Sequence, residues 1–245
     1  MSRHIHTSHT QLVALWLACV GWTLTTATMG LIQWRVWYVA DKSVISSGVA
    51  WVGIWRACFN SHTLVTPELR VMFCRGMGIA QDFTPPEVAV AQVLLPLSIL
   101  VGFGGIAGGV YALRNVYFGL ETSTPIRLVF RMAGSLCLLA TVMSLTPLLW
   151  NLSSVATNQT IHFPPDFHLP PAPVSQQVGA AISVGIIAAI LMTTAGIMLL
   201  SYRLPARTDR ARWKERRSVD GSASATMEVS IRGKDNLAFE FQEHL

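Results

Sequence analysis

The chain has 245 residues, of which 51% are hydrophobic and only 13% are charged, and it carries a formal net charge of +5. So few charged side chains cannot cover the surface of an ordinary water-soluble protein of this size. The composition therefore excludes that class and favours a membrane protein.

Four apolar runs cover approximately residues 12–32, 88–113, 128–149 and 178–202. Each holds about 20 or more residues, which at a rise of ~1.5 Å per residue is enough to cross a hydrocarbon core of about 30 Å. The first run follows Arg3 and three histidines, as a signal peptide would. It is longer than the roughly 7–15 residues of a signal-peptide core and no clean cleavage site follows, so we expect a retained helix.

Basic residues near the ends of these runs predict the orientation, because cytoplasmic loops carry the positive excess. The segment 203–217 contains seven basic residues and two acidic ones. The connection between the second and third runs contains Arg114, Arg127 and Arg131 against Glu121. With four spans, this connection and both termini lie on one side, which we expect to be the cytoplasm.

The expected organisation follows from these spans. In chain order it comprises a cytoplasmic N-terminus (1–10), a first span (11–32), a large outer loop (33–87), a second span (88–113), a cytoplasmic loop (114–127), a third span (128–149), a smaller outer loop (150–177), a fourth span (178–202) and a disordered cytoplasmic tail (203–245).

The two outer loops differ in composition. Residues 34–39 and 49–55 of the first loop are rich in strand-forming side chains, so short antiparallel strands are expected there. The second loop contains five prolines between residues 164 and 173, which disfavour a regular helix. We expect it to form a compact turn with at most one edge strand.

The four cysteines divide by location. Cys19 and Cys137 lie inside apolar runs, whereas Cys58 and Cys74 lie in the first outer loop and are the disulfide candidates. Such a bridge closes a loop of about 15 residues, contributes about 3 kcal/mol in the chain-entropy treatment and requires an oxidising compartment. Free thiols and a metal pair are the alternatives, but no paired histidines complete a tetrahedral metal site. We also expect Trp55 to cover one face of the bridge.

Two glycosylation sequons, beginning at Asn151 and Asn158, fall in the second outer loop. Asn151 is close to the membrane, so Asn158 is the expected acceptor, and an unused sequon is the alternative. Small residues recur in the second and fourth runs at spacings that let helices approach closely in lipid. They favour packing within one bundle over a dimerisation face, and they include Gly102, Gly104, Gly105, Gly108, Gly109, Gly179, Gly185 and Gly196.

The first outer loop resembles the signature of the claudin family. The residues that carry the resemblance are Trp34, Gly53-Ile54-Trp55, Cys58 and Cys74, with Gly21-Trp22, Gln33-Trp34-Arg35, Trp150 and Gln177-Val178-Gly179 beside them. The resemblance covers about residues 11–202. Peripheral-myelin-type proteins and the gamma subunits of calcium channels share the same framework.

The resemblance implies a left-handed four-helix bundle in the membrane, bearing a small extracellular antiparallel sheet made from both loops. It places Trp34 and Trp55 at the outer membrane boundary, although packing inside the loop is an alternative. Arg75 directly follows the second cysteine, where the family often carries the residue that sets charge selectivity. Phe163 and Phe167 are candidate contacts to a neighbouring cell's protein, with turn packing as the alternative.

The chain departs from the claudin pattern at several positions. The span from Cys58 to Cys74 is several residues longer than usual, and Gln92 stands where many claudins carry an arginine, so an arginine-dependent hydrogen bond is lost or replaced. The cytoplasmic cysteines that are often palmitoylated are absent from residues 114–124 and 203–245. The chain ends in Glu243-His244-Leu245 instead of Tyr-Val, which still suits a PDZ groove by strand addition.

The function implied by the resemblance is a tight-junction protein of the plasma membrane that assembles in cis and in trans to seal or charge-select the paracellular space. Its expected partners are other claudin-like protomers, membrane lipid and a PDZ scaffold, with no nucleic acid. An auxiliary subunit of a channel or receptor is the competing reading. We expect no enzyme activity and no cofactor. We also expect no metal site, because dispersed histidines such as His62, His162 and His168 lack ligand spacing.

Overall fold

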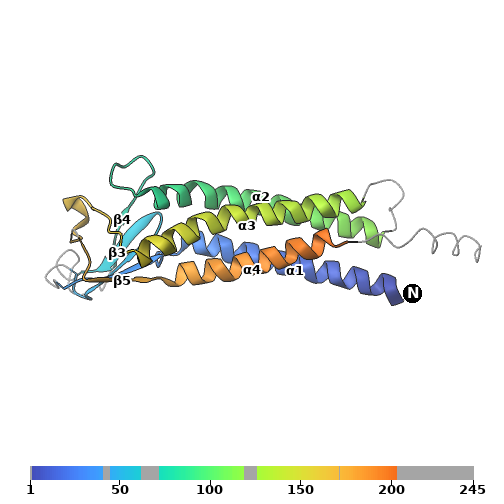
Figure 1. Cartoon of the computed structure of the whole chain (residues 1–245), viewed down its shortest axis with the longest axis horizontal. Coiled ribbons are helices and arrows are strands. Elements are labelled where there is room, and N and C mark those ends of the chain that lie inside the picture. Colours follow the sequence, from blue (N-terminus) through green and yellow to red (C-terminus); the bar gives the residue numbers. More distant parts are fainter. Residues whose placement is uncertain (1, 41–44, 62–71, 119–125, 171, 203–245) are drawn as a thin grey trace, which may run out of the picture. The chain divides into compact units, whose positions relative to one another are not determined.

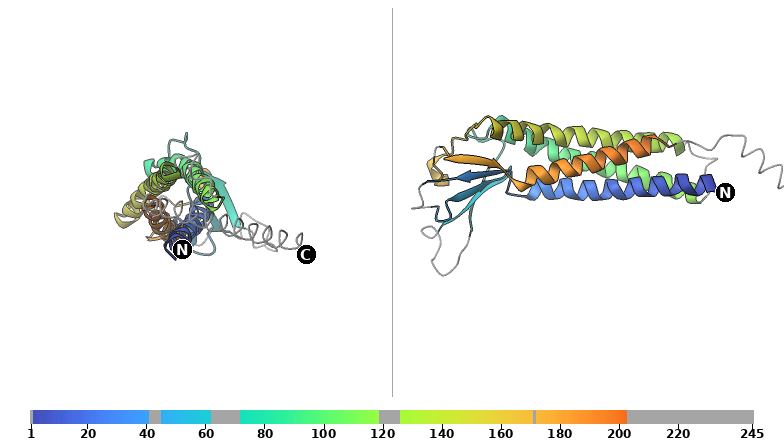
Figure 2. Two further views of the ribbon diagram at one scale, coloured as in Figure 1. Left: turned by 90° about the vertical axis from the view of Figure 1, so that its right-hand side faces the viewer. Right: turned by 60° about the horizontal axis from the view of Figure 1, so that its bottom comes forward.

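Four long apolar helices run side by side in the computed structural model of the chain (Figures 1 and 2). They are α1 (Ser2–Gly30), α2 (Pro86–Tyr117), α3 (Ile126–Ala156) and α4 (Ala180–Leu200). The structure describes residues 2–40, 45–61, 72–118, 126–170 and 172–202, with side chains from residue 9 onward. All four helices are long and apolar enough to cross a membrane, the candidate span within α1 being His9–Gly30.

The helices extend furthest beyond the predicted spans at two places. Helix α1 begins at Ser2, inside the expected N-terminal tail, and α3 continues to Ala156 where the prediction ended near residue 149. Polar residues of this last part of α3 are buried, namely Asn151 and Ser154, and they hydrogen-bond to Glu87 at the start of α2. Hydropathy alone misses this extension because its stabilising contacts are polar.

Each helix packs chiefly against two others, α1 and α3 both lying between α2 and α4. Glycines permit the closest approaches. A Cβ atom added to Gly105 of α2 would lie 2.9 Å from Cys137 Sγ of α3, and one added to Gly134 of α3 would lie 2.8 Å from the Gly196 carbonyl oxygen of α4. These glycines therefore pack within one bundle, as predicted. Gly104, by contrast, is exposed.

A five-stranded antiparallel sheet lies at one end of the bundle (Figure 2). Its strands are β1 (Arg35–Tyr38), β2 (Val49–Val52), β3 (Arg56–Asn60), β4 (Met72–Gly76) and β5 (Ser175–Val178), in the order β4-β3-β2-β1-β5. The two predicted strand regions contain β1 and β2. Strand β5 comes from the second outer loop and pairs with β1 at the edge of the sheet, so both loops build one sheet, as the resemblance implied.

Three hydrophobic clusters hold these parts together. One fills the bundle around Phe130 and Cys137. A second lies against the sheet and contains Trp37 and Phe59 together with Phe167 of the second outer loop. The third joins sheet and bundle, because it unites Trp34 and Ile54 with side chains of α2, α3 and α4, namely Val88, Ala91, Leu95, Leu148, Ala181 and Ile182. Packing therefore fixes the sheet onto the helix ends.

Candidate functional site

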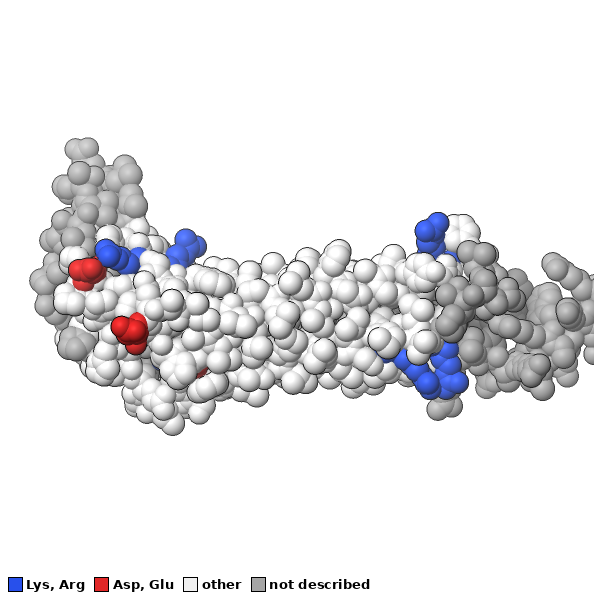
Figure 3. Space-filling model, turned by 90° about the horizontal axis from the view of Figure 1, so that it is seen from above, with Lys and Arg blue, Asp and Glu red and all other residues white. Residues whose placement is uncertain are grey.

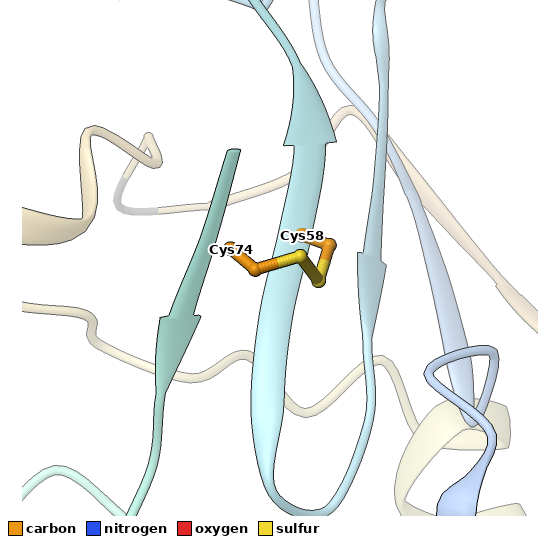
Figure 4. Close-up of a disulfide and its surroundings, with 2 residues drawn as sticks. All are labelled: Cys58 and Cys74. Carbon is orange, nitrogen blue, oxygen red and sulfur yellow. A yellow bond between two sulfur atoms is a disulfide. The ribbon is translucent and has the colours of Figure 1, made fainter. Parts of the chain in front are cut away.

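The disulfide joins Cys58 and Cys74, which face each other on β3 and β4 (Figure 4). Strand β4 is an edge strand whose side chains are mostly exposed, so burial holds it only weakly. The bridge thus ties this exposed edge strand to the inner strand β3. The side chain directly across from Cys58 is Trp51 of β2. Trp55 lies in the turn before β3, beyond the paired residues of β2, and its cover of the bridge stays a prediction.

The Gly53-Ile54-Trp55 turn and Trp34 form the joint between sheet and bundle. Trp34 is 1% exposed and its Nε1–H donates to the Thr28 carbonyl oxygen at 3.0 Å. A Cβ atom on residue 53 would lie 3.0 Å from the Ile32 Cα and 3.2 Å from two carbonyl oxygens, so glycine is needed for this close approach. Trp34 therefore packs between the sheet and the helices, whereas Trp55 is 41% exposed and is the more accessible of the two to the membrane boundary.

A second backbone contact joins β1 to the start of α4. The N–H groups of Gly179 and Ala181 donate to the carbonyl oxygens of Trp34 and Gln33, each at 3.0 Å. A Cβ atom on residue 179 would overlap the Gln33 carbonyl oxygen, so only glycine fits here. The Gln-Trp-Arg and Gln-Val-Gly motifs of the sequence thus meet at one joint.

A buried ion pair lies beside this joint. Arg35 Nη2 of β1 donates to Glu87 Oε1 of α2 at 2.6 Å, and the two residues are 1% and 3% exposed. The same nitrogen lies 3.1 Å from both Asn151 Oδ1 and Ser154 Oγ of α3. Ser154 also donates to Glu87 Oε1 at 2.8 Å. We call Arg35, Glu87, Asn151 and Ser154 the buried polar network.

Electrostatics make this network sensitive to the loss of either charge. Burial lowers the pKa of the Arg35 guanidinium below its ordinary value, while the hydrogen bond and charge of Glu87 act in the opposite direction. Arginine stays protonated in proteins, so the buried positive charge needs its carboxylate partner. The sequence prediction quoted Arg35 only as part of a motif and missed this role. The available signal was the position of the two charges: Arg35 follows the first apolar run and Glu87 precedes the second, so both lie on the same side of the membrane.

Gln92 replaces the arginine that many claudins carry at the start of the second span. Its Nε2 donates to the carbonyl oxygens of Ile54 and Met77 at 2.5 and 3.1 Å, and the residue is 6% exposed. The amide therefore ties α2 to the Gly53-Ile54-Trp55 turn and to the residue after β4. Gln92 thus supplies a neutral donor at the position where the resemblance predicted a lost or replaced hydrogen bond.

Arg75 lies at the exposed edge of the sheet. Its Nη2 is 3.4 Å from Asp166 Oδ2, and the two side chains are 48% and 72% exposed. The guanidinium also lies over the Phe167 ring, 5.8 Å from its centroid. Asp166 therefore partly offsets the positive charge of Arg75, the residue that the resemblance associates with charge selectivity.

The two phenylalanines proposed as contacts across the cell gap pack between the two outer loops. Phe167 is 3% exposed and lies in the short helix η1 (Pro165–Phe167), and Phe163 stacks on it with ring centroids 5.1 Å apart. Phe83 meets both rings edge-on or tilted. Turn packing, the alternative, accounts for these positions, and contact with a second cell's protein stays a prediction.

The two sequons differ sharply in accessibility. Asn151 is fully buried, and its Nδ2 donates to the carbonyl oxygens of Glu87 and Pro147 at 3.2 and 3.0 Å. Asn158 is exposed, follows α3 and has a φ of 53°, a left-handed conformation that asparagine tolerates. In the folded structure only the second amide is accessible to solvent and has room for a glycan.

We expect glycan on Asn158 and none on Asn151. Thr160→Ala removes the sequon of Asn158 and should abolish the mobility shift that peptide N-glycosidase F produces on gels. Ser153→Ala is the matched control, since it removes the other sequon at an exposed residue and leaves the Asn151 side chain unchanged. A glycan that survives Thr160→Ala, or that Ser153→Ala eliminates, contradicts the assignment.

The proposed PDZ ligand, Glu243-His244-Leu245, lies outside the described residues, as do the rest of the tail and His62. Within the described part of the chain, no group of three His, Cys, Asp or Glu side chains is arranged to hold a metal ion.

Comparison with known proteins agrees with this architecture. The sequence profile of the family described as PMP-22/EMP/MP20/Claudin tight junction matches residues 19–201. Claudin-3 of Mus musculus is 26% identical over 185 residues, which are 75% of this chain and 77% of that protein. Claudin-4 of Homo sapiens is 26% identical over 218 residues, which are 88% of this chain and 96% of that protein. The chain therefore belongs to the PMP-22/EMP/MP20/claudin family.

Proposed function

We propose that this protein is a claudin-like component of tight junctions, which assembles with other protomers in the same membrane and across the cell gap to seal or charge-select the paracellular space. The observation that carries the proposal is the sheet: both outer loops contribute strands, a disulfide ties one edge strand to its neighbour, and the buried polar network joins β1 to the two helices α2 and α3. No catalytic step is part of it.

The proposed orientation places the sheet outside the cell and both termini in the cytoplasm. Figure 3 supports it, because on this face the end away from the sheet shows basic side chains alone, the sheet end shows basic and acidic ones together, and the long surface between them shows neither. Arg114 at the end of α2 and Arg127 and Arg131 at the start of α3 belong to the end away from the sheet. A PDZ scaffold binding residues 243–245 would act on that cytoplasmic side.

The sheet has two different edges, each with an exposed apolar side chain nearby. Ile79, which follows β4, is 54% exposed, and Val174, which precedes β5, is 72% exposed. A head-to-tail contact between two unlike surfaces builds a ring where the rotation closes and an open chain where it does not. The proposed assembly is the open form, a linear strand of protomers.

Freeze-fracture imaging of claudin-null cells tests the proposal. The wild-type chain should form continuous strands, and Ile79→Asp should largely abolish them, because it places a charge in the apolar contact. Ala80→Asp is the matched control, as it adds the same charge at the next exposed residue. Diffuse membrane signal together with co-purification of a larger channel would support the auxiliary-subunit alternative instead.

Charge selectivity gives a second test if the strands contain pores. Asp166→Asn frees the Arg75 charge and should raise the preference for chloride over sodium, whereas Arg75→Asp should reverse it. Dilution potentials across monolayers expressing each variant measure the change. Unaltered potentials in both variants would show that Arg75 does not face the permeation path.

A further inference from the structure

A half-open groove of about 310 Å³ lies where α1 ends beneath the sheet. Residues 29–32 form one wall, and Gly53, Trp55 and Arg56 form the other. The lining is apolar except for the Arg56 guanidinium. Since the candidate span of α1 ends at Gly30, the groove lies at the boundary between hydrocarbon and water on the sheet side.

We propose that this groove binds a phospholipid of the sheet-side leaflet, with the phosphate on Arg56 and the start of an acyl chain along residues 29–32. An arginine fork matches a phosphate's oxygens, and an exposed indole such as Trp55 suits the membrane interface. The inference depends on the four spans and is independent of junction assembly.

The charges and space of the groove agree with this occupant. Arg56 is exposed and makes no ion pair with any other residue in the described ranges. Leu31 and Trp55 are 36% and 41% exposed, although both are large and apolar. A Cβ atom added to Gly30 meets nothing within 4 Å, so the groove is open at that point. A sterol would leave the Arg56 charge without a partner, because the neutral hydroxyl of a sterol does not neutralise a guanidinium.

The volume sets how much of the lipid is held. Pockets that enclose small molecules occupy about 300–1,000 Å³. The groove is at the lower limit of that range, so it accommodates the glycerol region and the first part of one chain, while the remaining lipid stays in the bilayer. The turn that carries Gly53 and Trp55 is also bound by Gln92, so a lipid here contacts the same joint that positions the sheet.

Photolabelling of the full chain in phosphatidylcholine vesicles tests the proposal. The probe is a phosphatidylcholine with a diazirine near the glycerol end of one acyl chain, and labelled residues are mapped by mass spectrometry. Residues 29–32 and 53–56 should be labelled well above lipid-facing helix positions such as Leu100 and Ile187, which are 69% and 53% exposed. Equal labelling of the groove and these positions would overturn the proposal.

Two variants separate the phosphate contact from the chain contact. Arg56→Gln should reduce groove labelling about tenfold, the effect of losing a charge-assisted hydrogen bond. Gly30→Leu fills the open space and should reduce labelling to the level of the helix surface. Arg75→Gln and Gly104→Leu are the matched controls, since they remove an exposed arginine or add a leucine at an exposed glycine elsewhere.

The headgroup is tested with a diacylglycerol that carries the same photoreactive chain but no phosphate. It should label the groove about as weakly as phosphatidylcholine labels the Arg56→Gln variant. Three results overturn the proposal: equal labelling by diacylglycerol, groove labelling that Gly30→Leu leaves unchanged, and a photoreactive sterol that displaces phosphatidylcholine. Unchanged thermal unfolding midpoints of the variants establish that they fold.

Discussion

Glu87→Gln should destabilise the protein by about 3–5 kcal/mol, because it leaves the Arg35 charge buried without a carboxylate partner. The substitution keeps the size of the side chain and an oxygen at the position that now lies 2.6 Å from Arg35 Nη2, so the loss reports on charge and not on a cavity. For a chain of this size the change corresponds to a fall of roughly 6–20 °C in the thermal unfolding midpoint. Tryptophan fluorescence in detergent micelles measures it.

Two comparisons define what this effect means. Asp166→Asn breaks the exposed Arg75–Asp166 pair and should change stability by at most about 1 kcal/mol, since solvent screens such pairs. The double variant Arg35→Met with Glu87→Leu removes both buried charges and should recover most of the stability lost in Glu87→Gln. A single variant as stable as the wild type, or a double variant weaker than the single one, would contradict the role given to the charge pair.

Elements governed by hydrophobicity were predictable from the sequence. Runs of about 20 apolar residues identified all four helices, because a helix satisfies all its backbone hydrogen bonds within one segment in lipid, whereas membrane strands are shorter and need a closed barrel. The same reasoning placed the glycines of α2 inside the bundle, and Gly105 lies there against Cys137. Strands β1 and β2 followed from local strand propensity.

Features that depend on contacts between distant segments were not predictable in this way. In the buried polar network, Arg35 bonds to Glu87, Asn151 and Ser154, which follow it in the chain by 52, 116 and 119 residues. Its carboxylate lies at the edge of an apolar run, where a charge ordinarily remains in water. Hydropathy therefore gave no reason to extend α3 to Ala156. The burial of Trp34 and the exposure of Trp55 also depend on contacts between distant segments, so two similar sequence motifs did not distinguish them.

Residue chemistry at the joint also shows how one departure from the family pattern is accommodated. An arginine buried at position 92 would need a counter-charge or several carbonyl oxygens. Gln92 is neutral and donates to two carbonyl oxygens through one amide nitrogen. Its Oε1 has no hydrogen-bond partner among the described residues. The replacement therefore keeps the link between α2 and the Gly53-Ile54-Trp55 turn without a second buried charge beside Arg35.

Removal of the disulfide should give the second large loss. Cys58→Ser together with Cys74→Ser should lower the free energy of unfolding by about 3 kcal/mol, the loop-closure contribution expected for a loop of this length. This corresponds to roughly 6–12 °C in the unfolding midpoint. The change should concentrate in β4, an edge strand whose side chains are mostly exposed and whose backbone pairs with β3. Amide hydrogen exchange should therefore accelerate in residues 72–76 far more than in β1.

The free cysteines provide the control that separates the bridge from cysteine content. Cys19 and Cys137 carry free thiols in the bundle, so Cys19→Ser should leave the midpoint sensitive to dithiothreitol, as in the wild type. The unfolding midpoint of the double variant at Cys58 and Cys74 should not change with the reductant, because this variant has no disulfide to reduce. If reduction shifts the double variant as much as the wild type, the stabilisation comes from another source. If exchange in β4 stays slow, pairing and packing hold the edge strand, and Arg75 keeps its place beside Asp166 without help from the bridge.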